Sequence, residues 1–293
     1  MAGTTTTVVR ERHTVNPLDK PWGHWLQMVI LIFIGLLTLM PLLWVISTSF
    51  RTLRDSFTVP PVWIHFDFDF SNFQSVFDTI PFLNMLKNSF LYAGGAVVGV
   101  AVTSALAGYA FARLQFRGRD LLFWVVLSTM MVPGQMTVIP VYILMGVKYL
   151  NLINTIWSLI IPSLFTAFGT FLLRQYFRQV PADFEESALI DGANQWQIFY
   201  RIYLPLAAPG IAILSILTFN GRWNDYFTPL VFINSQHSMP ITMGIVELQG
   251  EWSTGSIAVV FAGIVLSVIP VIVVYIFGQR YLLEGLMMGG IKG

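Results

Sequence analysis

The sequence predicts an all-α membrane protein with six transmembrane helices. The chain of 293 residues is 55% hydrophobic and only 11% charged, whereas about 25% of the residues in an ordinary soluble domain are charged. Six apolar stretches of about 20 residues are each long enough to cross a bilayer as a helix. The net charge of +1 is too small for the counterion release that drives nucleic-acid binding. We therefore expect the lipid bilayer as the environment and no nucleic-acid partner.

The predicted spans are residues 26–48, 89–112, 121–146, 153–173, 210–232 and 256–277. They form a membrane domain over 26–280, between an N-terminal tail (1–25) and a C-terminal tail (281–293). Pro133 and Pro140 lie in the third span and Pro162 lies in the fourth. A membrane helix tolerates proline where neighbouring groups satisfy the freed carbonyls, so we expect the third span to be bent or broken.

Six spans place both termini on one side of the membrane, and the basic residues indicate which side. Eleven of them lie on the side of the termini: Arg10, Arg12, Lys20, Arg113, Arg117, Arg119, Arg174, Arg178, Arg201, Arg280 and Lys292. Four lie on the opposite side, namely Arg51, Arg54, Lys87 and Lys148, and Arg222 lies inside a span. Because cytoplasmic loops are enriched in Lys and Arg, we expect both termini to be cytoplasmic, together with the polar segment 181–205.

The second span carries a stripe of small residues. Gly95 and Gly99 form a GxxxG pattern that Thr103 and Ala107 continue at the same spacing. Small residues on one face allow two helix backbones to approach closely. We expect this face to pack within the subunit, and an interface between subunits is the alternative.

The polar segment 181–205 has two predicted helix starts. Asp183 is followed three residues later by Glu186, and Asn194 by Gln197; both pairs fit an N-cap with a polar partner at N3. Asp191 and Gly192 form a turn between them. The first helix would present Phe184, Ala188 and Leu189, and the second Trp196, Phe199, Tyr200 and Ile202. Such a pair can rest on lipid headgroups, cover its own subunit or dock into a partner.

One motif in this segment resembles a known family. Glu186-Ser187-Ala188, then Gly192 and Ile202-x-Leu204-Pro205, are similar to the EAA motif of membrane subunits of ATP-binding-cassette importers. Ser187 replaces the first alanine of the motif, and its small size preserves close helix contact. The segments "NSFLYAGGAVV", "AGYAFARLQFRGRD", "MMVPGQMTVIPVYILM", "RWNDYFTPLVFI" and "GQRYLLEGLMMGGIKG" also resemble carbohydrate importers, most closely the shorter permease of the maltose-transporter type.

This resemblance implies a type I importer permease fold in the cytoplasmic (inner) membrane of a bacterium or archaeon. It implies that residues 181–205 form coupling helices seated in a groove of an ATPase subunit. The coupling residues would be Glu185, Glu186, Ser187, Ala188, Asp191 and Gly192. The implied partners are a second homologous permease, two ATP-binding subunits, which bind the ATP and Mg, and an extracytoplasmic solute-binding protein.

The sequence gives no sign of catalysis by the chain itself. It has no GxxxxGK[ST] phosphate-binding loop, so we do not expect it to hydrolyse ATP. It has no cysteine, and its four histidines, His13, His24, His65 and His237, are scattered without the spacing of a metal site. We expect no cofactor and no metal in this chain.

The fifth span contains the charged residues Arg222 and Asp225, three positions apart. Ionisable side chains inside a membrane usually face a cavity or a partner, and these two could pair with each other. The alternative is that they line the translocation path together with Asn220, Trp223 and Asn224. Amides, a carboxylate and an indole suit a sugar, while Arg222 would favour an anionic or phosphorylated solute.

Two further expectations complete the prediction. The outer loop alternates apolar and polar residues from His65 to Phe70, as a short exposed strand does, and its aromatic residues would settle at the membrane interface or receive the solute-binding protein. The alternative function is an ion-coupled secondary transporter, although such carriers commonly show inverted repeats and acids within their spans. The sequence does not name the solute.

Overall fold

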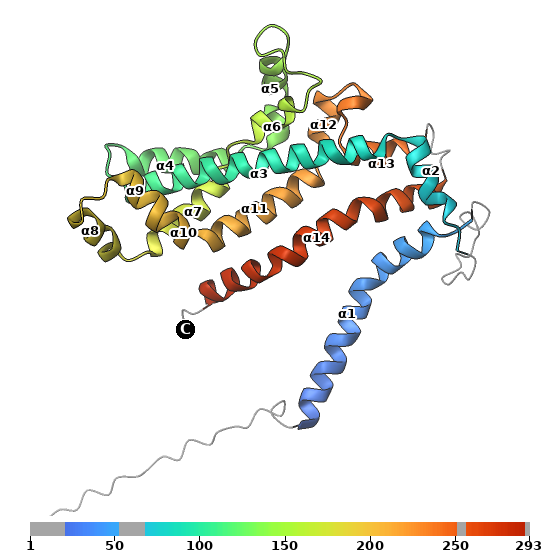
Figure 1. Cartoon of the computed structure of the whole chain (residues 1–293), viewed down its shortest axis with the longest axis horizontal. Helices are drawn as coiled ribbons and strands as arrows, with labels where there is room; N and C mark the ends of the chain where they lie inside the picture. The colour runs from blue at the N-terminus through green and yellow to red at the C-terminus, as the bar shows by residue number, and fades with distance from the viewer. Residues whose placement is uncertain (1–20, 53–67, 251–255, 291–293) are drawn as a thin grey trace, which may run out of the picture.

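The computed structural model describes residues 21–52, 68–250 and 256–290, and every regular element in these ranges is a helix (Figure 1). Three helices are long and apolar enough to cross a membrane: α1 (Pro21–Ser49), α3 (Phe82–Arg113) and α14 (Ile257–Gly290). Three bent helix pairs raise the number of candidate spans in the described residues to six. This agrees with the six spans predicted from hydropathy.

The third predicted span is broken, as its prolines indicated. α4 (Arg119–Ser128) continues as a 3-10 turn, η3 (Thr129–Met131), and stops before Pro133. The chain restarts at η4 (Gly134–Thr137) and α5 (Val138–Met145), at 95° to the first half. Proline lacks the N–H that would continue the backbone hydrogen bonds of the helix, so the break follows from the sequence.

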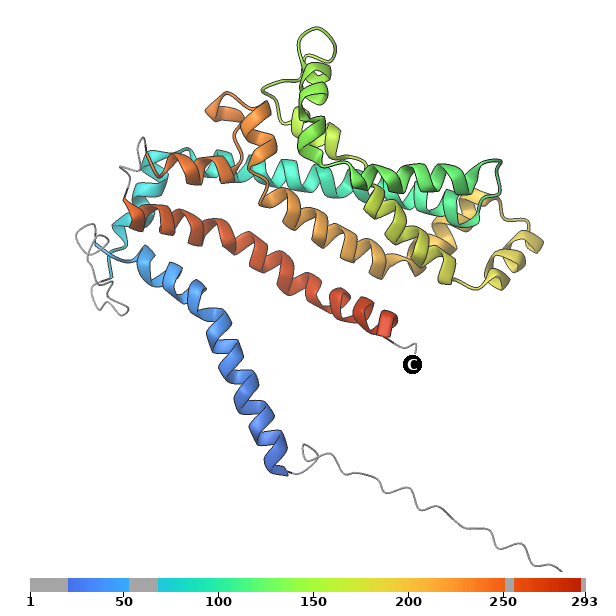
Figure 2. The same cartoon turned by 180° about the vertical axis from the view of Figure 1, so that it is seen from behind.

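The other two pairs bend less sharply. α6 (Trp157–Ser163) meets α7 (Ala167–Gln179) at 44°. α9 (Gln195–Ile198), the π-helical turn η5 (Phe199–Tyr203) and α10 (Leu204–Leu206) meet α11 (Ala208–Trp223) at 71°. In each case the second helix continues into the bundle of α3, α11 and α14 (Figures 1 and 2).

The predicted fifth span, 210–232, is wrong as a single helix. α11 ends at Trp223, and α12 (Phe227–Phe232) is a separate short helix. The Asp225 carboxylate accepts a hydrogen bond from the Thr228 N–H at 3.0 Å, and the Asp225 main-chain oxygen accepts one from the Thr242 hydroxyl at 2.9 Å. Thr242 lies in α13 (Ile241–Glu247), after the turn η6 (Gln236–Ser238). These bonds turn the chain out of the helix.

α3 is the central helix of the bundle and contacts α6, α7, α11 and α13. Its small-residue stripe packs inside the subunit, which confirms the expectation. A Cβ on Gly95 would lie 2.9 Å from the Ile160 side chain, a Cβ on Gly99 would overlap Leu164, and the Thr103 hydroxyl donates to the Leu164 main-chain oxygen at 2.6 Å. Gly95 and Gly99 therefore permit the close approach of the α6–α7 bend.

The outer loop contains a helix that the hydropathy pattern did not indicate. α2 (Ser71–Thr79) is held by Asn72, whose side-chain amide donates to the main-chain oxygens of Ser49 at 3.1 Å and Arg51 at 2.8 Å. Residues 65–67 of the predicted strand lie outside the described residues, and residues 68–70 lead into α2 without forming a strand. The partners of Asn72 are more than 20 positions away in sequence, so local patterns could not reveal them.

Candidate functional site

The polar segment 181–205 folds as two short helices joined by a tight turn. α8 (Ala182–Ile190) is followed by Asp191 at its C-cap. Gly192 has a φ of +82°, a left-handed conformation that favours glycine. The capping box at α9 is confirmed: Asn194 Oδ1 accepts from the Gln197 N–H at 2.9 Å, and Gln197 Oε1 accepts from the Asn194 N–H at 2.8 Å.

The predicted N-cap at Asp183 is wrong. The N-cap position is Pro181, two residues earlier, so α8 begins at Ala182, and no side chain caps it. Proline has a preset φ that suits the entry to a helix, so the chain turns helical at Ala182. Asp183 and Glu185 instead lie in the first turn, where negative charge complements the partial positive charge of the helix N-terminus.

Two tyrosine hydroxyls connect these short helices to the membrane spans. The Tyr203 hydroxyl donates to Glu185 Oε2 in α8 at 2.8 Å. The Tyr109 hydroxyl, near the end of α3, donates to Gln195 Oε1 in α9 at 2.7 Å. Each of the two helices is therefore held by one hydrogen bond to a buried tyrosine.

The same tyrosines belong to an aromatic cluster at the loop end of the bundle, formed by Tyr109, Phe177, Phe199 and Tyr203. The Tyr109 ring lies 5.0 Å from Phe199 and 5.2 Å from Tyr203, and Phe177 lies 6.0 Å from Tyr203. The Arg113 guanidinium lies 4.9 Å above the Tyr203 ring and donates to the Phe177 main-chain oxygen at 2.8 Å. This packing connects α8 and α9 to α3 and α7 as one block.

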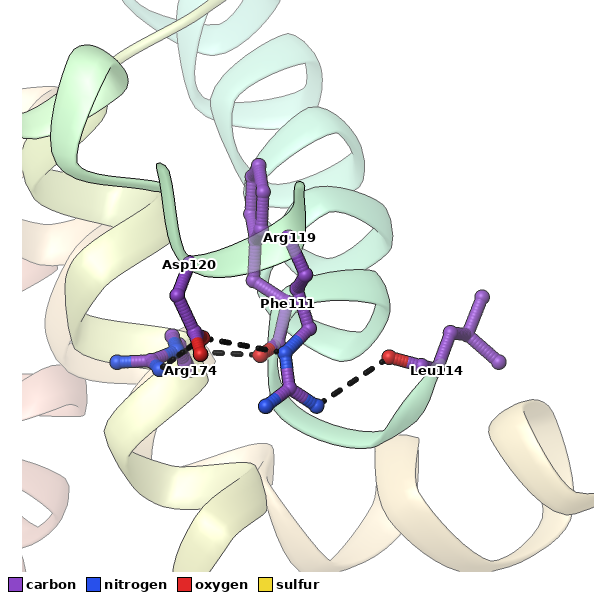
Figure 3. Close-up of polar contacts among 5 residues, drawn as sticks. All are labelled: Phe111, Leu114, Arg119, Asp120 and Arg174. Atoms are coloured by element: carbon purple, nitrogen blue, oxygen red, sulfur yellow. Dashed lines mark hydrogen bonds and ion pairs between the residues drawn. The ribbon is translucent and has the colours of Figure 1, made fainter. Parts of the chain in front are cut away.

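A second polar cluster fastens α3, α4 and α7 at the same end (Figure 3). The Arg174 guanidinium lies 3.8 Å over the Phe123 ring, donates to the Phe111 main-chain oxygen at 3.2 Å and lies 3.8 Å from Asp120. Asp120 also pairs with Arg119 at 3.2 Å. Because Asp120 is 67% exposed, its ion pairs are screened by solvent, and the stacking of Arg174 on Phe123 is the buried part of this cluster.

The outer surface of the two helices is unusually apolar. Ile190 is 87% exposed and Trp196 is 67% exposed; Phe184, Leu189 and Tyr200 are also exposed, as predicted. Glu186 and Ser187 lie on this surface. Phe199 was expected on the surface too, but it is buried in the aromatic cluster. A hollow of about 330 Å³ between the helices is lined by Ala188, Asp191, Gly192, Ala193, Gln197, Ile198, Arg201 and Ile202.

The break in the third span opens a second candidate site. A cavity of about 390 Å³ lies between the broken span, α3, α6 and the end of α11. Its lining is mixed polar and apolar: Tyr92, Gly134, Gln135, Thr137, Val138, Val141, Leu159, Pro162, Ser163, Gly221, Arg222, Asp225, Phe227, Thr228 and Phe232. Arg222 and Asp225, for which the sequence analysis offered a place on the path as one of two alternatives, therefore both line this cavity.

Asp225 is held by several donors at the wall of this cavity. The Tyr92 hydroxyl donates to Asp225 Oδ2 at 2.7 Å, and the Thr228 N–H donates to Oδ1. Arg222 Nη1 lies 3.8 Å from Oδ2, longer than a hydrogen bond. The two alternatives of the sequence analysis are therefore compatible: Arg222 lies close to Asp225, and both residues line the cavity.

The other three residues predicted on the path lie elsewhere. Trp223 is buried, stacks on Phe219 at 5.3 Å and donates its indole N–H to the Ser267 main-chain oxygen at 3.2 Å. Asn220 and Asn224 are exposed on another face of α11, where the Asn224 amide donates to Asn220 Oδ1 at 3.0 Å. Trp223 joins α11 to α14, so among these five residues only Arg222 and Asp225 line the cavity.

The family is decided by a comparison with protein-family models. The model described as the inner membrane component of binding-protein-dependent transport systems matches residues 102–283. This region is more than half of the chain and contains the loop, Arg222 and Asp225. The chain belongs to this family.

Individual relatives cover almost the whole permease. It is 31% identical to the arabinooligosaccharides transport system permease protein AraQ of Halalkalibacterium halodurans, over 94% of this chain and 98% of that protein. It is 32% identical to the polygalacturonan/rhamnogalacturonan transport system permease protein YtcP of Bacillus subtilis, over 90% and 96% of the two chains.

A solved structure shows the same fold. A chain of a bacterial ATP-binding-cassette transporter involved in the import of the acidic polysaccharide alginate is 28% identical and superposes with a TM-score of 0.78. The match covers 91% of the permease and 99% of that chain.

Family membership confirms the importer resemblance and the membrane location, and it decides against the ion-coupled alternative. The permease is a transport component and not an enzyme. The roles of the individual loop and cavity residues stay predictions. The sequence analysis did not assign a site role to four residues, Tyr92, Tyr109, Arg113 and Tyr203. Each acts through a hydrogen bond to a residue 18 to 133 positions away, which local patterns do not reveal.

Proposed function

We propose that the permease is one of two membrane subunits of an ATP-driven importer of a sugar or sugar-like solute. The observation that carries this proposal is the exposed apolar surface of α8 and α9, which is anchored to the spans by two tyrosine hydroxyls. An exposed amphipathic helix is a common element of helix-in-groove docking. The occupied groove belongs to an ATP-binding subunit, which holds the ATP and Mg.

Within the loop the predicted coupling residues divide into two groups. Glu186, Ser187, Asp191 and Gly192 are exposed and contact the ATPase. Glu185 and Ala188 are partly buried, and Glu185 accepts the hydrogen bond of Tyr203. Glu185 therefore sets the angle of α8, while its neighbour Glu186 makes the docking contact.

The remaining partners follow from the incomplete path. The cavity of about 390 Å³ in this chain forms half of the passage for the solute. A second homologous permease supplies the other half. A solute-binding protein delivers the solute from outside. The sugar is supported by the relatives, which are permeases for arabinooligosaccharides and for polygalacturonan or rhamnogalacturonan.

The docking surface is tested by co-purification of an ATPase with the detergent-solubilised permease. The wild-type chain is expected to retain an ATPase whose activity is measurable in the eluate. Gly192→Asp and Glu186→Ala are expected to lose the ATPase or to uncouple its hydrolysis from transport.

The chain offers matched controls for both variants. Gly118 has a φ of +83° with open space around it, as Gly192 has, so Gly118→Asp introduces similar backbone strain outside the loop. Asp78→Ala removes an exposed acid from α2. If the controls lose the ATPase as readily as the loop variants, or if both loop variants keep the ATPase and couple its hydrolysis to transport as the wild type does, the docking surface lies elsewhere.

A further inference from the structure

Arg222 lies where two cavities of the permease meet. The cavity described above contains Tyr92 and Asp225. A second cavity, of about 220 Å³, is lined by Val100, Thr166, Phe168, Leu214, Leu217, Thr218, Gly221 and Arg222. Among the residues that the structure describes, Gly221 and Arg222 are the two that line both cavities. Because α11 runs away from the coupling loop, Leu214 and Thr218 lie nearer that loop than Arg222, and Asp225 lies farther from it.

The Arg222 guanidinium has donors available to a solute. Its side chain is 34% exposed, and its pairing with Asp225 is a 3.8 Å ion pair, not a hydrogen bond. A guanidinium carries five N–H donors in a fork that matches a carboxylate. Because Arg222 lines both cavities and is partly exposed, its guanidinium is placed to reach a solute there.

Asp225 does not depend on Arg222 for its hydrogen bonds. Its two carboxylate oxygens already accept from the Tyr92 hydroxyl and from the Thr228 N–H. If the guanidinium turns toward an arriving anion, the buried carboxylate keeps both donors. The exchange of partners thus avoids leaving an unpaired charge, which is the costly outcome inside a protein.

We propose that the solute is an oligosaccharide that carries carboxylates, such as a uronate, and that Arg222 binds one carboxylate as the sugar passes between the two cavities. This inference rests on the proposed function. A charged side chain inside a span is expensive unless it serves a path or a partner, and a neutral sugar does not require a guanidinium. The nearby negative charge of Asp225 disfavours a dianionic phosphate ester, whereas a carboxylate has a single charge and the planar shape that Arg pairs with in bidentate fashion.

The relatives do not decide the charge of the solute. One compared permease is named for arabinooligosaccharides and another for polygalacturonan or rhamnogalacturonan, while the compared solved transporter is involved in the import of an acidic polysaccharide. The class of solute is therefore inferred from Arg222 and its surroundings.

The test uses the complete importer, with its second permease, ATPases and binding protein, in proteoliposomes. Uptake is measured for trigalacturonate, for the same trisaccharide with its carboxyls reduced to alcohols, and for a sugar phosphate monoester, which is a dianion near neutral pH. Arg222→Gln is expected to lower trigalacturonate uptake about tenfold or more, the usual range for loss of a charge-assisted hydrogen bond, and to lower uptake of a neutral sugar less. Arg222→Lys is expected to keep part of the acidic uptake.

The control variant is Arg280→Gln, the same substitution at an exposed arginine of α14, which is expected to leave uptake unchanged. Equal losses for acidic and neutral sugars would make Arg222 structural and overturn the inference. If Arg222→Gln does not assemble, an equal loss of acidic and neutral uptake in Arg222→Lys overturns the inference. Preferred uptake of the neutral sugar or of the sugar phosphate by the wild type overturns it as well. Import of a neutral sugar alone leaves the proposed function standing, whereas an importer that takes up no sugar contradicts both.

Discussion

At the scale of single residues, the loop formed by residues 181–205 is held by few but directed contacts. Tyr203 is fully buried, and its hydroxyl is the contact between the aromatic cluster and Glu185 in α8. Tyr109 does the same for Gln195 in α9. A movement of the two helices must therefore carry these tyrosines with it or break their hydrogen bonds. The two hydroxyls are the polar contacts of the cluster with α8 and α9, and they add to the packing of the rings.

Tyr203→Phe removes one hydroxyl and keeps the ring in its packing. A hydrogen bond of this kind contributes about 1 kcal/mol, so we expect an about fivefold lower ratio of solute imported to ATP hydrolysed, with assembly intact. The measurement is ATPase rate and uptake in the same proteoliposomes. Tyr149→Phe, at an exposed tyrosine outside the loop, is the control for loss of a hydroxyl. An unchanged ratio in Tyr203→Phe would show that the aromatic packing alone transmits the movement.

At the scale of helices, close approach depends on glycines in α3. A Cβ on Gly108 would lie 2.9 Å from the Arg174 main-chain nitrogen and 3.1 Å from the Leu173 carbonyl carbon, whereas a Cβ on Gly94 would meet nothing within 4 Å. Both substitutions to alanine bring a similar gain in helix propensity. They differ in that α7 must move only in Gly108→Ala.

We expect Gly108→Ala to destabilise the permease by about 1–3 kcal/mol, the usual cost of overpacking, and Gly94→Ala to leave its stability unchanged or slightly raised. The measurement is the thermal midpoint of the detergent-solubilised chain. It is read from the loss of the monodisperse peak in size-exclusion chromatography as the temperature is raised. Equal midpoints for the two variants would mean that α3 and α7 separate at little cost.

The elements that the sequence predicted are those whose cause is local. The long apolar spans, the break at Pro133 and the capping box at Asn194 each depend on a few neighbouring residues. α2 and the end of α11 were not predicted, because Asn72 and Asp225 act through partners in other elements. Trp223 was read as part of the path, yet its indole binds the Ser267 main-chain oxygen in α14. A polar residue within an apolar run indicates that its side chain has a polar partner, but the sequence does not show which residue that partner is.

At the scale of the whole molecule, large areas of the surface consist of apolar side chains, whose exposure to water would be unfavourable. α1 contacts α14 along part of its length and diverges from the rest of the bundle (Figures 1 and 2). Leu31 is 68% exposed, Phe33 64% and Leu37 57%. Lipid tails are as apolar as these side chains, so helices in a bilayer need no protein cover. The exposure is what a membrane helix requires.

The orientation of the whole chain decides whether the coupling loop can reach an ATPase at all. The excess of basic residues predicts that the end carrying α8 and α9 is cytoplasmic. The chain has no cysteine, so single cysteines report their side of the membrane without further mutation. Gln115→Cys lies beside the start of α4 at the loop end, and His237→Cys lies in η6 at the far end; both positions are exposed. We expect a membrane-impermeant maleimide to label His237→Cys in intact cells and Gln115→Cys only after permeabilisation. The reverse pattern would place α8 and α9 outside, where no ATP-driven subunit could bind them.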